Sequence, residues 1–337
     1  MKITFGILTL CKGGAQRMLA ELANGLVRRG HDVNIVMPDY GVIEYPLMAN
    51  VIRTNNQLIN GVDYPPSDVI ISNYYTTVTG AAEASVQGKG KHVRLSLCYE
   101  PIFLPENEHS FITYNATEKL VVLSKWQKDI IQLNHGIIGK IVPVGISSEF
   151  VNLHQRSAQK PIMVSAIVRR IEDGNWHRQQ DYLLEVLTNI KMKYPHIIAT
   201  LITPPNEFRT SQKLKQLYSE QLFQFVLPQN DQQLNAIYNQ TDIFVNSSIY
   251  DTASLPGLEA MKTGAALVTT YNGGNADYAR HEENCLLSYR YQNRLQQDIE
   301  RLIENPELRK RLAAEGEKEA SSWTWERSVD LFEQAIL

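Results

Sequence analysis

The feature that most constrains the fold of this chain is a repeated alternation of short apolar runs with stretches of helical pattern, found in both halves. Strands that alternate with helices form parallel sheets that helices cover on both faces. We therefore predict an α/β protein of two Rossmann-like domains whose parallel sheets face each other across a cleft. The strands predicted in the first half are Ile3–Leu8, Val33–Met37, Val69–Ser72, Val93–Leu97, Leu120–Leu123 and Ile141–Val144. The strands predicted in the second half are Ile162–Ile167, Ile198–Ile202, Phe223–Leu227, Ile243–Asn246, Leu267–Thr270 and Cys285–Leu287.

Helical patterns and one polar segment divide the chain. Ala15–Arg29 has apolar residues at helical spacing, and Trp325–Ile336, the last of three closing helical stretches, carries an apolar stripe typical of core packing. The segment Ser147–Pro161 is polar and aperiodic, as expected of a linker. We predict an N-terminal domain over residues 1–150, a C-terminal domain over 151–318 and a terminal helical segment over 319–337.

Composition excludes several classes of protein. The net charge of -3 and the pI near 6.3 give no basic surface, so we expect no nucleic-acid partner. No apolar run approaches the ~20 residues of a spanning helix, and the start MKITFGILTL has the pattern of a strand and not of a signal peptide. Three scattered cysteines indicate a reducing compartment. We therefore expect a cytoplasmic protein.

Sequence motifs for metal ions and common cofactors are missing. There is no D-x-D, no H-E-x-x-H and no paired C-x-x-C, and neither dinucleotide nor P-loop glycine motifs occur. We therefore expect no metal and no cofactor. If the protein handles a phosphate leaving group, cations and helix dipoles must neutralise its charge.

The stretch YDTASLPGLEAMKTG, Tyr250–Gly264, predicts a loop that leads from a buried strand into a short helix. The apolar run Asp242–Ser248 precedes it, and Pro256 and the closing glycine are typical of the two ends of a helix. Such a loop and helix start offer N–H groups to a negatively charged ligand. Two carboxylates, Asp251 and Glu259, flank the loop. Because ligands bind at the carboxyl ends of parallel strands, we expect this loop at the binding site.

Two other stretches are suited to a phosphate-bearing ligand. Gly13 and Gly14 follow the first strand, where they either admit a ligand close to the backbone or simply form a tight turn. Arg169, Arg170 and Arg178 follow the first strand of the second half, and an arginine can hold a diphosphate through two hydrogen bonds. We expect two of the three to bind phosphate and at least one to be solvated.

These stretches resemble the family 4 glycosyltransferases, which have two Rossmann domains in the metal-independent fold called GT-B. GGAQRMLAELANGLVRRGHDVNIV resembles the family's first loop, helix and second strand, and VPVGISSEF resembles its interdomain entry segment. QNDQQLNAIYNQTDIFVNSSIYDTASLPGLEAMKTGAALVTTYNGG resembles its donor-site core. The family carries two glutamates separated by seven residues, and here Asp251 and Glu259 have that spacing.

The resemblance implies roles for these residues. Glu259 accepts hydrogen bonds from a ribose, Asp251 holds a sugar hydroxyl, and the N–H groups of residues 252–255 face the diphosphate and sugar. Asp251 is one methylene shorter than the usual glutamate, so it must lie closer to the sugar or act through water. The residues implied to bind the donor are Gly13, Gly14, Arg170, Arg178, Leu227, Thr252, Ala253, Ser254, Leu255 and Glu259. Those implied in catalysis are Asp251, Glu259 and Glu100.

The resemblance also assigns an acceptor side to the first domain, where the family often has a histidine. Here the segment reads LSLCYEPIFLP, so Cys98, Tyr99 and Glu100 are expected to line that side. Glu100 either orients and deprotonates an acceptor hydroxyl or caps the backbone turn before Pro101. The terminal helix is implied to cross back onto the first domain.

The implied reaction is transfer of a sugar from a nucleotide-diphosphate sugar to an acceptor hydroxyl, with retention at the anomeric carbon. The phrase YEPIFLP resembles transferases of bacterial surface polysaccharides, so a saccharide or a lipid-linked acceptor is expected. Arg28, Arg29 and His31 suit either peripheral contact with the inner face of a membrane or a solvated helix end. Two alternatives keep the fold: a nucleotide-sugar epimerase or sugar phosphorylase, and a catalytically idle GT-B subunit that supports a partner.

Overall fold

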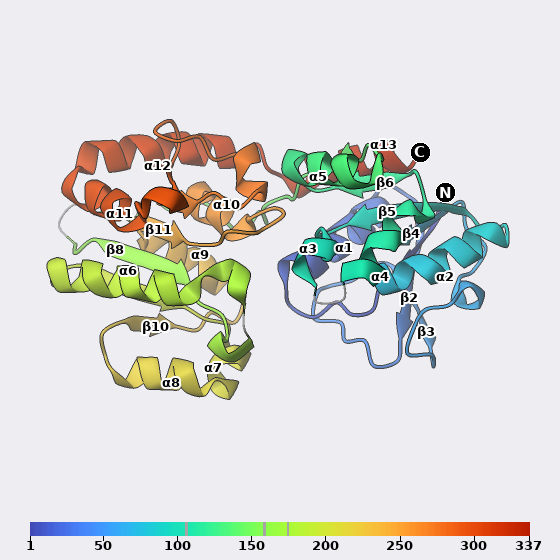
Figure 1. The fold of residues 1–337 in the computed structure, drawn as a ribbon, viewed down its shortest axis with the longest axis horizontal. Coiled ribbons are helices and arrows are strands. Elements are labelled where there is room, and N and C mark those ends of the chain that lie inside the picture. The colour runs from blue at the N-terminus through green and yellow to red at the C-terminus, as the bar shows by residue number, and fades with distance from the viewer. Residues whose placement is uncertain (105–106, 158–159, 174) are drawn as a thin grey trace. The chain divides into compact units, whose positions relative to one another are not determined.

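The chain folds into two α/β units, each built around its own parallel sheet (Figure 1). The structure is a computed structural model that describes residues 1–104, 107–157, 160–173 and 175–337. The predicted fold class, two α/β domains with parallel sheets, is confirmed.

The chain leaves the first unit once and returns to it at the end. The first unit contains Met1–Gly145 together with Thr324–Leu337, and the second contains Ile146–Trp323. The sequence prediction divided the chain after residues 150 and 318. Residues 158–159 of the predicted linker, and Gly174 between the predicted arginines, lie outside the described residues.

The sheet of the first unit has seven strands, all paired in parallel. They are β1 (Lys2–Gly6), β2 (Asp32–Pro38), β3 (Asn50–Thr54), β4 (Val69–Ser72), β5 (Lys91–Ser96), β6 (Leu120–Val122) and β7 (Lys140–Ile141). Their order is β3-β2-β1-β4-β5-β6-β7, so the chain builds outward from β1 to one edge and then crosses to β4. The edge strand β3 was missed by the sequence analysis, because it is short and only its last residue is buried.

The sheet of the second unit contains all six strands predicted for it. They are β8 (Met163–Ile167), β9 (Ile198–Ile202), β10 (Gln224–Val226), β11 (Ile243–Asn246), β12 (Ala266–Thr270) and β13 (Leu286–Ser288). Their order, β10-β9-β8-β11-β12-β13, repeats the plan of the first sheet. The central strands are apolar and buried, as expected where helices cover both faces.

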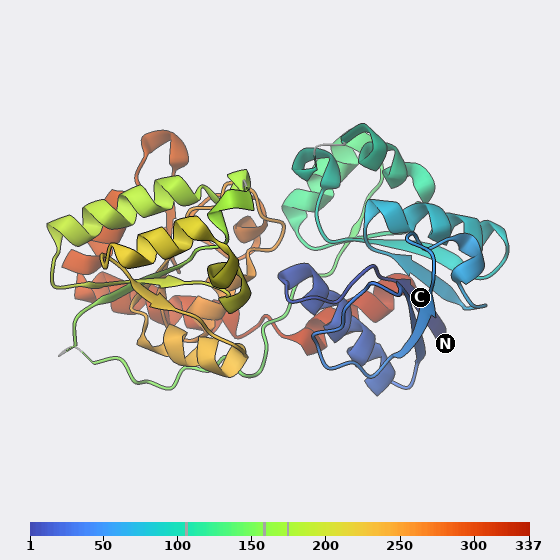
Figure 2. The same ribbon diagram turned by 90° about the horizontal axis from the view of Figure 1, so that it is seen from below.

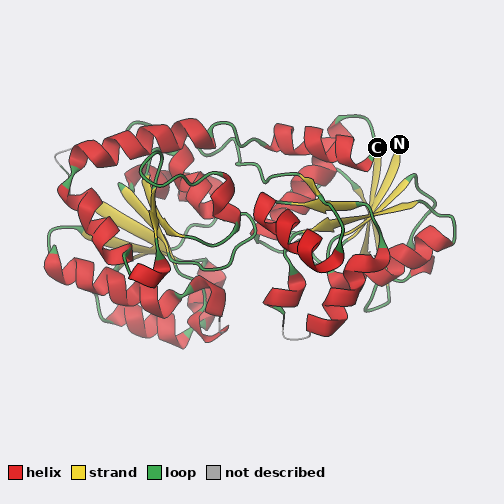
Figure 3. Ribbon diagram, turned by 45° about the horizontal axis from the view of Figure 1, so that its top comes forward, coloured by secondary structure: helices red, strands yellow, loops and turns green. Residues whose placement is uncertain are grey.

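Helices cover both faces of the strands in each unit (Figure 3). Those of the first unit are α1 (Gly14–Arg28), α2 (Tyr75–Val86), α3 (Glu100–Phe103), α4 (Asn107–Ile112), α5 (Lys125–His135), α13 (Trp325–Ile336) and the 3₁₀ helices η1 (Gly61–Asp63) and η2 (Thr113–Ala116). Those of the second are α6 (Gln180–Lys193), α7 (Pro205–Thr210), α8 (Gln212–Ser219), α9 (Asp231–Gln240), α10 (Leu255–Lys262), α11 (Leu295–Glu304), α12 (Pro306–Ala320), and η3 (Ile171–Asp173), η4 (Trp176–Arg178), η5 (Gly274–Asp277) and η6 (Arg290–Gln292).

The last helix, α13, packs within the first unit beside α1 (Figure 2). Gly25 of α1 allows the close approach, since a Cβ there would lie 2.3 Å from Cγ2 of Val329. The ring of Phe332 stacks on that of Phe5 of β1 with 6.2 Å between centroids. The apolar stripe predicted from the sequence therefore fills the core next to β1.

Candidate active site

Two loops of the second unit meet where the strand order of its sheet reverses. β8 has β9 on one side and β11 on the other, so the chain runs to opposite edges from these neighbouring strands. Open α/β sheets bind ligands at the carboxyl ends of the strands at such a point. The loops after β8 and β11 touch here: the Ile249 N–H donates to the His177 carbonyl at 2.8 Å, and Ser247 Oγ donates to the Arg178 carbonyl at 2.7 Å.

The arginines that follow β8 have different partners. Arg169 forms an ion pair with Glu207 of α7, with Nε 2.7 Å from Oε1, and the Arg170 N–H donates to the other oxygen of Glu207 at 2.7 Å. Glu207 therefore holds both the side chain of Arg169 and the backbone of Arg170.

Arg178 differs from Arg169 in that its Nε is buried without a hydrogen-bond acceptor among the described residues. The side chain as a whole is half-buried. Burial, and then the charge of Arg169, lowers the pKa of Arg178, while the charges of Asp251 and Glu207 oppose this. A partly buried cation with an unbonded N–H is costly, so this group suits an anionic ligand.

Asp251 joins the loop after β11 to the end of β12. Its N–H donates to the Asn272 carbonyl and its own carbonyl accepts from the Gly274 N–H, each at 2.8 Å. Glycine is required at position 274 because a Cβ there would lie 2.2 Å from the carbonyl oxygen of Thr252. The backbone of the loop is thus held from two sides.

The side chain of Asp251 closes a turn on the same loop. Its Oδ1 accepts from the N–H groups of Ala253 at 3.2 Å and Ser254 at 2.9 Å. The prediction that the N–H groups of Thr252, Ala253, Ser254 and Leu255 all face a diphosphate therefore needs correction. Two of these groups already have an acceptor, because a short aspartate side chain readily bonds the backbone two and three residues ahead.

Ser254 connects the loop to the start of α10 in a left-handed conformation, with φ 53°. The residue is completely buried, and its Oγ accepts from the side-chain amides of Asn246 at 3.1 Å and Asn272 at 3.0 Å. The Tyr278 hydroxyl donates to its carbonyl at 2.9 Å. These bonds compensate the strain that a non-glycine residue carries at positive φ.

The helix α10 carries the second predicted carboxylate, Glu259. It begins at Leu255, one residue before the predicted start, with Pro256 as its second residue. Glu259 is half-buried, and the hydroxyl of the buried Tyr238 lies 3.4 Å from its Oε2. Burial, and then the charge of Glu259, raises the pKa of Tyr238. Leu227, predicted at the base-binding loop, is half-buried directly after β10, the edge strand two places from β8.

In the first unit the predicted glycine turn lies between β1 and α1 and is hydrogen-bonded to the loop that follows β2. The N–H of Lys12 donates to the Glu44 carboxylate at 2.7 Å, and the Gly13 N–H donates to the Tyr45 hydroxyl at 2.9 Å. A Cβ added to Gly14 would meet no atom within 4 Å. Gly14 is therefore the more open of the two predicted glycines.

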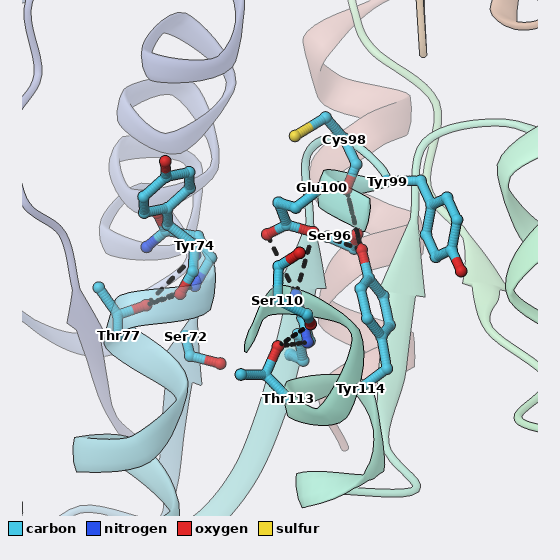
Figure 4. Close-up of polar contacts among 12 residues, drawn as sticks. Ser72, Tyr74, Thr77, Ser96, Cys98, Tyr99, Glu100, Ser110, Thr113 and Tyr114 are labelled. Carbon is cyan, nitrogen blue, oxygen red and sulfur yellow. Dashed lines mark hydrogen bonds and ion pairs between the residues drawn. The ribbon is translucent and has the colours of Figure 1, made fainter. Parts of the chain in front are cut away.

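Glu100, predicted either as a base or as a turn cap, is a buried ion-pair partner instead (Figure 4). Its carboxylate lies 3.0 Å from Nη2 of Arg94, both side chains are 0% exposed, and it accepts from the Tyr114 hydroxyl. Arg94 also donates to Thr113 Oγ1 at 2.8 Å and lies 3.6 Å from the centre of the Tyr114 ring. Burial places Glu100 out of reach of a substrate hydroxyl, which is at odds with the predicted role as a base.

Cys98 and Tyr99, the other residues predicted on the acceptor side, flank this cluster. In Figure 4 the Cys98 thiol and the Tyr99 ring point in different directions. The Tyr99 hydroxyl lies 3.1 Å from Nε2 of His135. Burial, and then the charge of Glu100, raises the pKa of the Cys98 thiol and raises that of Tyr99 to about 12. Both groups are therefore protonated at neutral pH.

Three sets of residues that organise these sites were missed by the sequence analysis. Arg94 could have been found, because a charged residue inside the buried strand HVRLS needs a partner. Glu207 gave no comparable signal, since an acidic residue in a first helical turn is ordinary. The amides Asn246 and Asn272 gave none either, because their common partner Ser254 is defined only by the folded loop.

Across residues 1–104, 107–157, 160–173 and 175–337, no three His, Cys, Asp or Glu side chains are grouped to hold a metal ion. None of the helices in the same ranges has the length and apolar character needed to cross a membrane.

Part of the second unit matches a known protein family. Residues 163–319 match the family described as Glycosyl transferases group 1. Glycosyltransferase 1 domain-containing protein 1 of Xenopus tropicalis is 28% identical over 161 residues, which are 46% of this chain and 46% of that protein. The match thus spans about half the length of the curated relative.

Solved structures resemble the chain over almost its whole length. Sucrose-phosphate synthase from Thermosynechococcus elongatus has a TM-score of 0.81 at 16% identity, with 99% of this chain and 98% of that chain covered. HepE of Anabaena, in complex with UDP and glucose, has a TM-score of 0.78 at 17% identity and the same coverage. WaaG, a glycosyltransferase of lipopolysaccharide biosynthesis, has a TM-score of 0.76 at 15% identity, with 99% of both chains covered. The chain therefore has the GT-B fold, and the part of it that carries the arginine and carboxylate loops matches the group 1 glycosyl transferases.

Proposed function

We propose that this protein is a glycosyltransferase that moves a sugar from a nucleotide-diphosphate sugar to an acceptor hydroxyl with retention of anomeric configuration. The observation that carries the proposal is Arg178, a half-buried cation at the switch point of the second sheet whose Nε has no hydrogen-bond acceptor among the described residues. The group 1 match covers this loop, and the similar protein HepE has been solved with UDP-glucose.

Different residues of the second unit bind the different parts of the donor. Arg178 and Arg170 bind the diphosphate, and Glu259 accepts hydrogen bonds from the ribose hydroxyls. Oδ2 of Asp251, the oxygen not used by the loop, faces a sugar hydroxyl. Leu227 and the loop after β10 contact the base.

The chemistry requires stabilisation of the leaving group. As the bond between the anomeric carbon and the diphosphate oxygen breaks, its electron pair passes to that oxygen, and the acceptor oxygen forms the new bond and loses its proton. Arg178 and the N-terminus of α10 stabilise the developing negative charge. Retention requires the acceptor to attack from the face that the diphosphate leaves. We infer that these protein charges carry out the step without a metal or a cofactor.

The acceptor is proposed from analogy with similar proteins. WaaG acts in lipopolysaccharide biosynthesis, which favours a saccharide or lipid-linked acceptor and a role in surface polysaccharide or glycoconjugate synthesis. Such an acceptor suits a cytoplasmic enzyme that meets the inner face of a membrane. The half-buried Cys98 and the Tyr99 hydroxyl remain the candidates for the acceptor side in the first unit.

Calorimetric titration with UDP, GDP, ADP and dTDP tests the proposal. Arg178→Met should weaken binding of the preferred nucleotide about 10- to 100-fold, because charge-assisted hydrogen bonds are lost. Arg311→Met is the matched control, since it removes the same charge from the exposed surface of α12 and should leave affinity unchanged. Wild-type protein that binds none of the four nucleotides would refute the donor site and favour an idle subunit.

A further inference from the structure

The segment predicted as a linker, Ser147–Pro161, is hydrogen-bonded to helix α9 of the second unit. The Val151 N–H donates to Asn235 Oδ1 at 3.1 Å, and the Leu153 N–H donates to Asn239 Oδ1 at 2.7 Å. The side-chain amide of Asn239 in turn donates to the Val151 carbonyl at 2.9 Å. Asn235 and Asn239 lie one turn apart on α9, so the segment is bonded to one face of that helix.

Arg156, further along this segment, donates from all three of its guanidinium nitrogens to backbone carbonyls. Nε donates to Thr241 at 2.8 Å, Nη1 to Thr263 at 2.7 Å and Nη2 to Tyr238 at 2.6 Å. Thr241 and Thr263 directly follow α9 and α10, and Tyr238 lies in the last turn of α9. The carbonyls at the end of a helix carry partial negative charge, and a planar guanidinium can bond several of them at once. Arg156 thus joins the C-terminal ends of the two helices.

The close approach of Arg156 depends on Gly264, the glycine after α10. Its φ of 82° lies in the left-handed region that favours glycine. A Cβ there would lie 2.5 Å from Nδ2 of Asn152 and 3.0 Å from Nη1 of Arg156. Asn152 is itself held by Glu317 of α12, whose carboxylate accepts from Nδ2 at 2.7 Å. The glycine therefore leaves room for the segment and its guanidinium to reach the helix ends.

The bonds of Arg156 close a ring with Glu259, the carboxylate proposed to bind the ribose. The hydroxyl of Tyr238 lies 3.4 Å from Oε2 of Glu259, and the Thr263 N–H donates to the Glu259 carbonyl at 3.2 Å. Since Arg156 donates to the carbonyls of Tyr238 and Thr263, the four residues form one cycle of hydrogen bonds. Tyr238 is completely buried and Glu259 is half-buried. In a close-packed interior, the separation of α9 and α10 at this end therefore sets where the Glu259 carboxylate lies.

We propose that Arg156 is a positioning residue for the ribose contact: it holds α9 and α10 at the separation at which Tyr238 hydrogen-bonds the carboxylate of Glu259. Arg156 acts through the two helices and touches no ligand. Without it, three carbonyls at the helix ends lose a donor, the helices shift, and Glu259 loses the hydroxyl that orients it. A shift of about 1 Å in a binding group is enough to weaken its contact with a ligand. The ribose contact rests on the proposed function, whereas the ring rests on its own hydrogen bonds.

Crystal structures of the wild-type protein and Arg156→Met test the ring without any ligand. In Arg156→Met the Tyr238 hydroxyl and the Glu259 carboxylate should lie farther apart than a hydrogen bond allows, and an unchanged contact would overturn the inference. Arg309→Met is the matched control. Arg309 is also half-buried and donates to the carbonyl of Leu302, at 2.5 Å, in the last turn of α11. Its loss should leave the contact between Tyr238 and Glu259 in place.

Calorimetric titration then tests the effect on ribose binding, with the ribonucleotide that binds best among UDP, GDP and ADP and with its 2′-deoxy form. Arg156→Met should weaken binding of the ribonucleotide about tenfold, as for one lost hydrogen bond to a charged group, and should weaken the 2′-deoxy form less. In the Glu259→Ala background the same substitution should change affinity by less than about twofold, because the contact through which it acts is already lost. Arg156→Lys keeps the charge but not the planar fork, so it should show the same pattern with a smaller loss, and it replaces Arg156→Met if that variant does not fold.

The pattern of losses separates positioning from general destabilisation of the unit. Equal losses for the ribonucleotide and its 2′-deoxy form, or an undiminished loss in the Glu259→Ala background, would overturn the inference. Wild-type protein that binds no ribonucleotide would instead refute the proposed function. The distance between Tyr238 and Glu259 in the two crystal structures would then still decide whether Arg156 positions that carboxylate.

Discussion

Replacement of Glu100 by leucine should destabilise the first unit severely, although the residue lies on no surface. The Arg94–Glu100 pair is 0% exposed at both ends with 3.0 Å between the charged atoms. Removing the carboxylate leaves the Arg94 guanidinium buried without a counter-charge, which costs about 3–5 kcal/mol. A unit of this size loses roughly 2–4 °C in melting temperature per kcal/mol, so we expect a drop of roughly 6–20 °C.

Differential scanning calorimetry of three variants checks this reasoning. The double variant Arg94→Met/Glu100→Leu should recover most of the loss, because an apolar pair of similar volume needs no counter-charge. Asp129→Asn, which breaks the exposed pair with Lys125, should change stability by less than about 1 kcal/mol. If Glu100→Leu has the melting temperature of the wild type, or if the double variant melts no higher than the single one, Glu100 does not stabilise the unit as the counter-charge of Arg94.

Two further predictions concern pH and the loop after β11. Burial, and then the charge of Arg94, lowers the pKa of His92 to about 4, below the 6.5 of an unfolded histidine, so protonation favours the unfolded chain. The free energy of unfolding should be highest above about pH 6.5 and should fall by about 3 kcal/mol as the pH drops towards 4. Urea unfolding over this range should show a smaller decrease for His92→Gln than for the wild type. An equal decrease in the two proteins would contradict the role of His92. Gly274→Ala places a Cβ 2.2 Å from the carbonyl oxygen of Thr252 and should weaken nucleotide binding about tenfold or more by displacing the loop. Unchanged nucleotide affinity in a calorimetric titration would show that binding does not depend on the position of the loop.

The sequence by itself determined the architecture of this protein. Each apolar run and each helical spacing is a local pattern, and alternation of the two kinds of segment is sufficient to specify parallel sheets covered by helices. The start of α10 near Pro256 and the apolar stripe of α13 follow from the same local chemistry. The sequence analysis did not predict the edge strand β3. An edge strand is not buried on both faces, so its residues, NVIRT, lack the apolar run of a central strand.

Only the tertiary structure decided which charged side chains pair within the protein and which can contact a ligand. Three arginines follow β8 in the sequence, yet Arg169 is neutralised by Glu207 of α7, while Nε of Arg178 has no acceptor among the described residues. Glu100 is indistinguishable from a catalytic base in the sequence, yet Arg94 of the neighbouring strand buries it. The partner of Arg169 is 38 residues away, and no local pattern encodes that proximity. Arg94 and Glu100 are six residues apart, but the sequence does not show that both side chains are buried and turned toward one another.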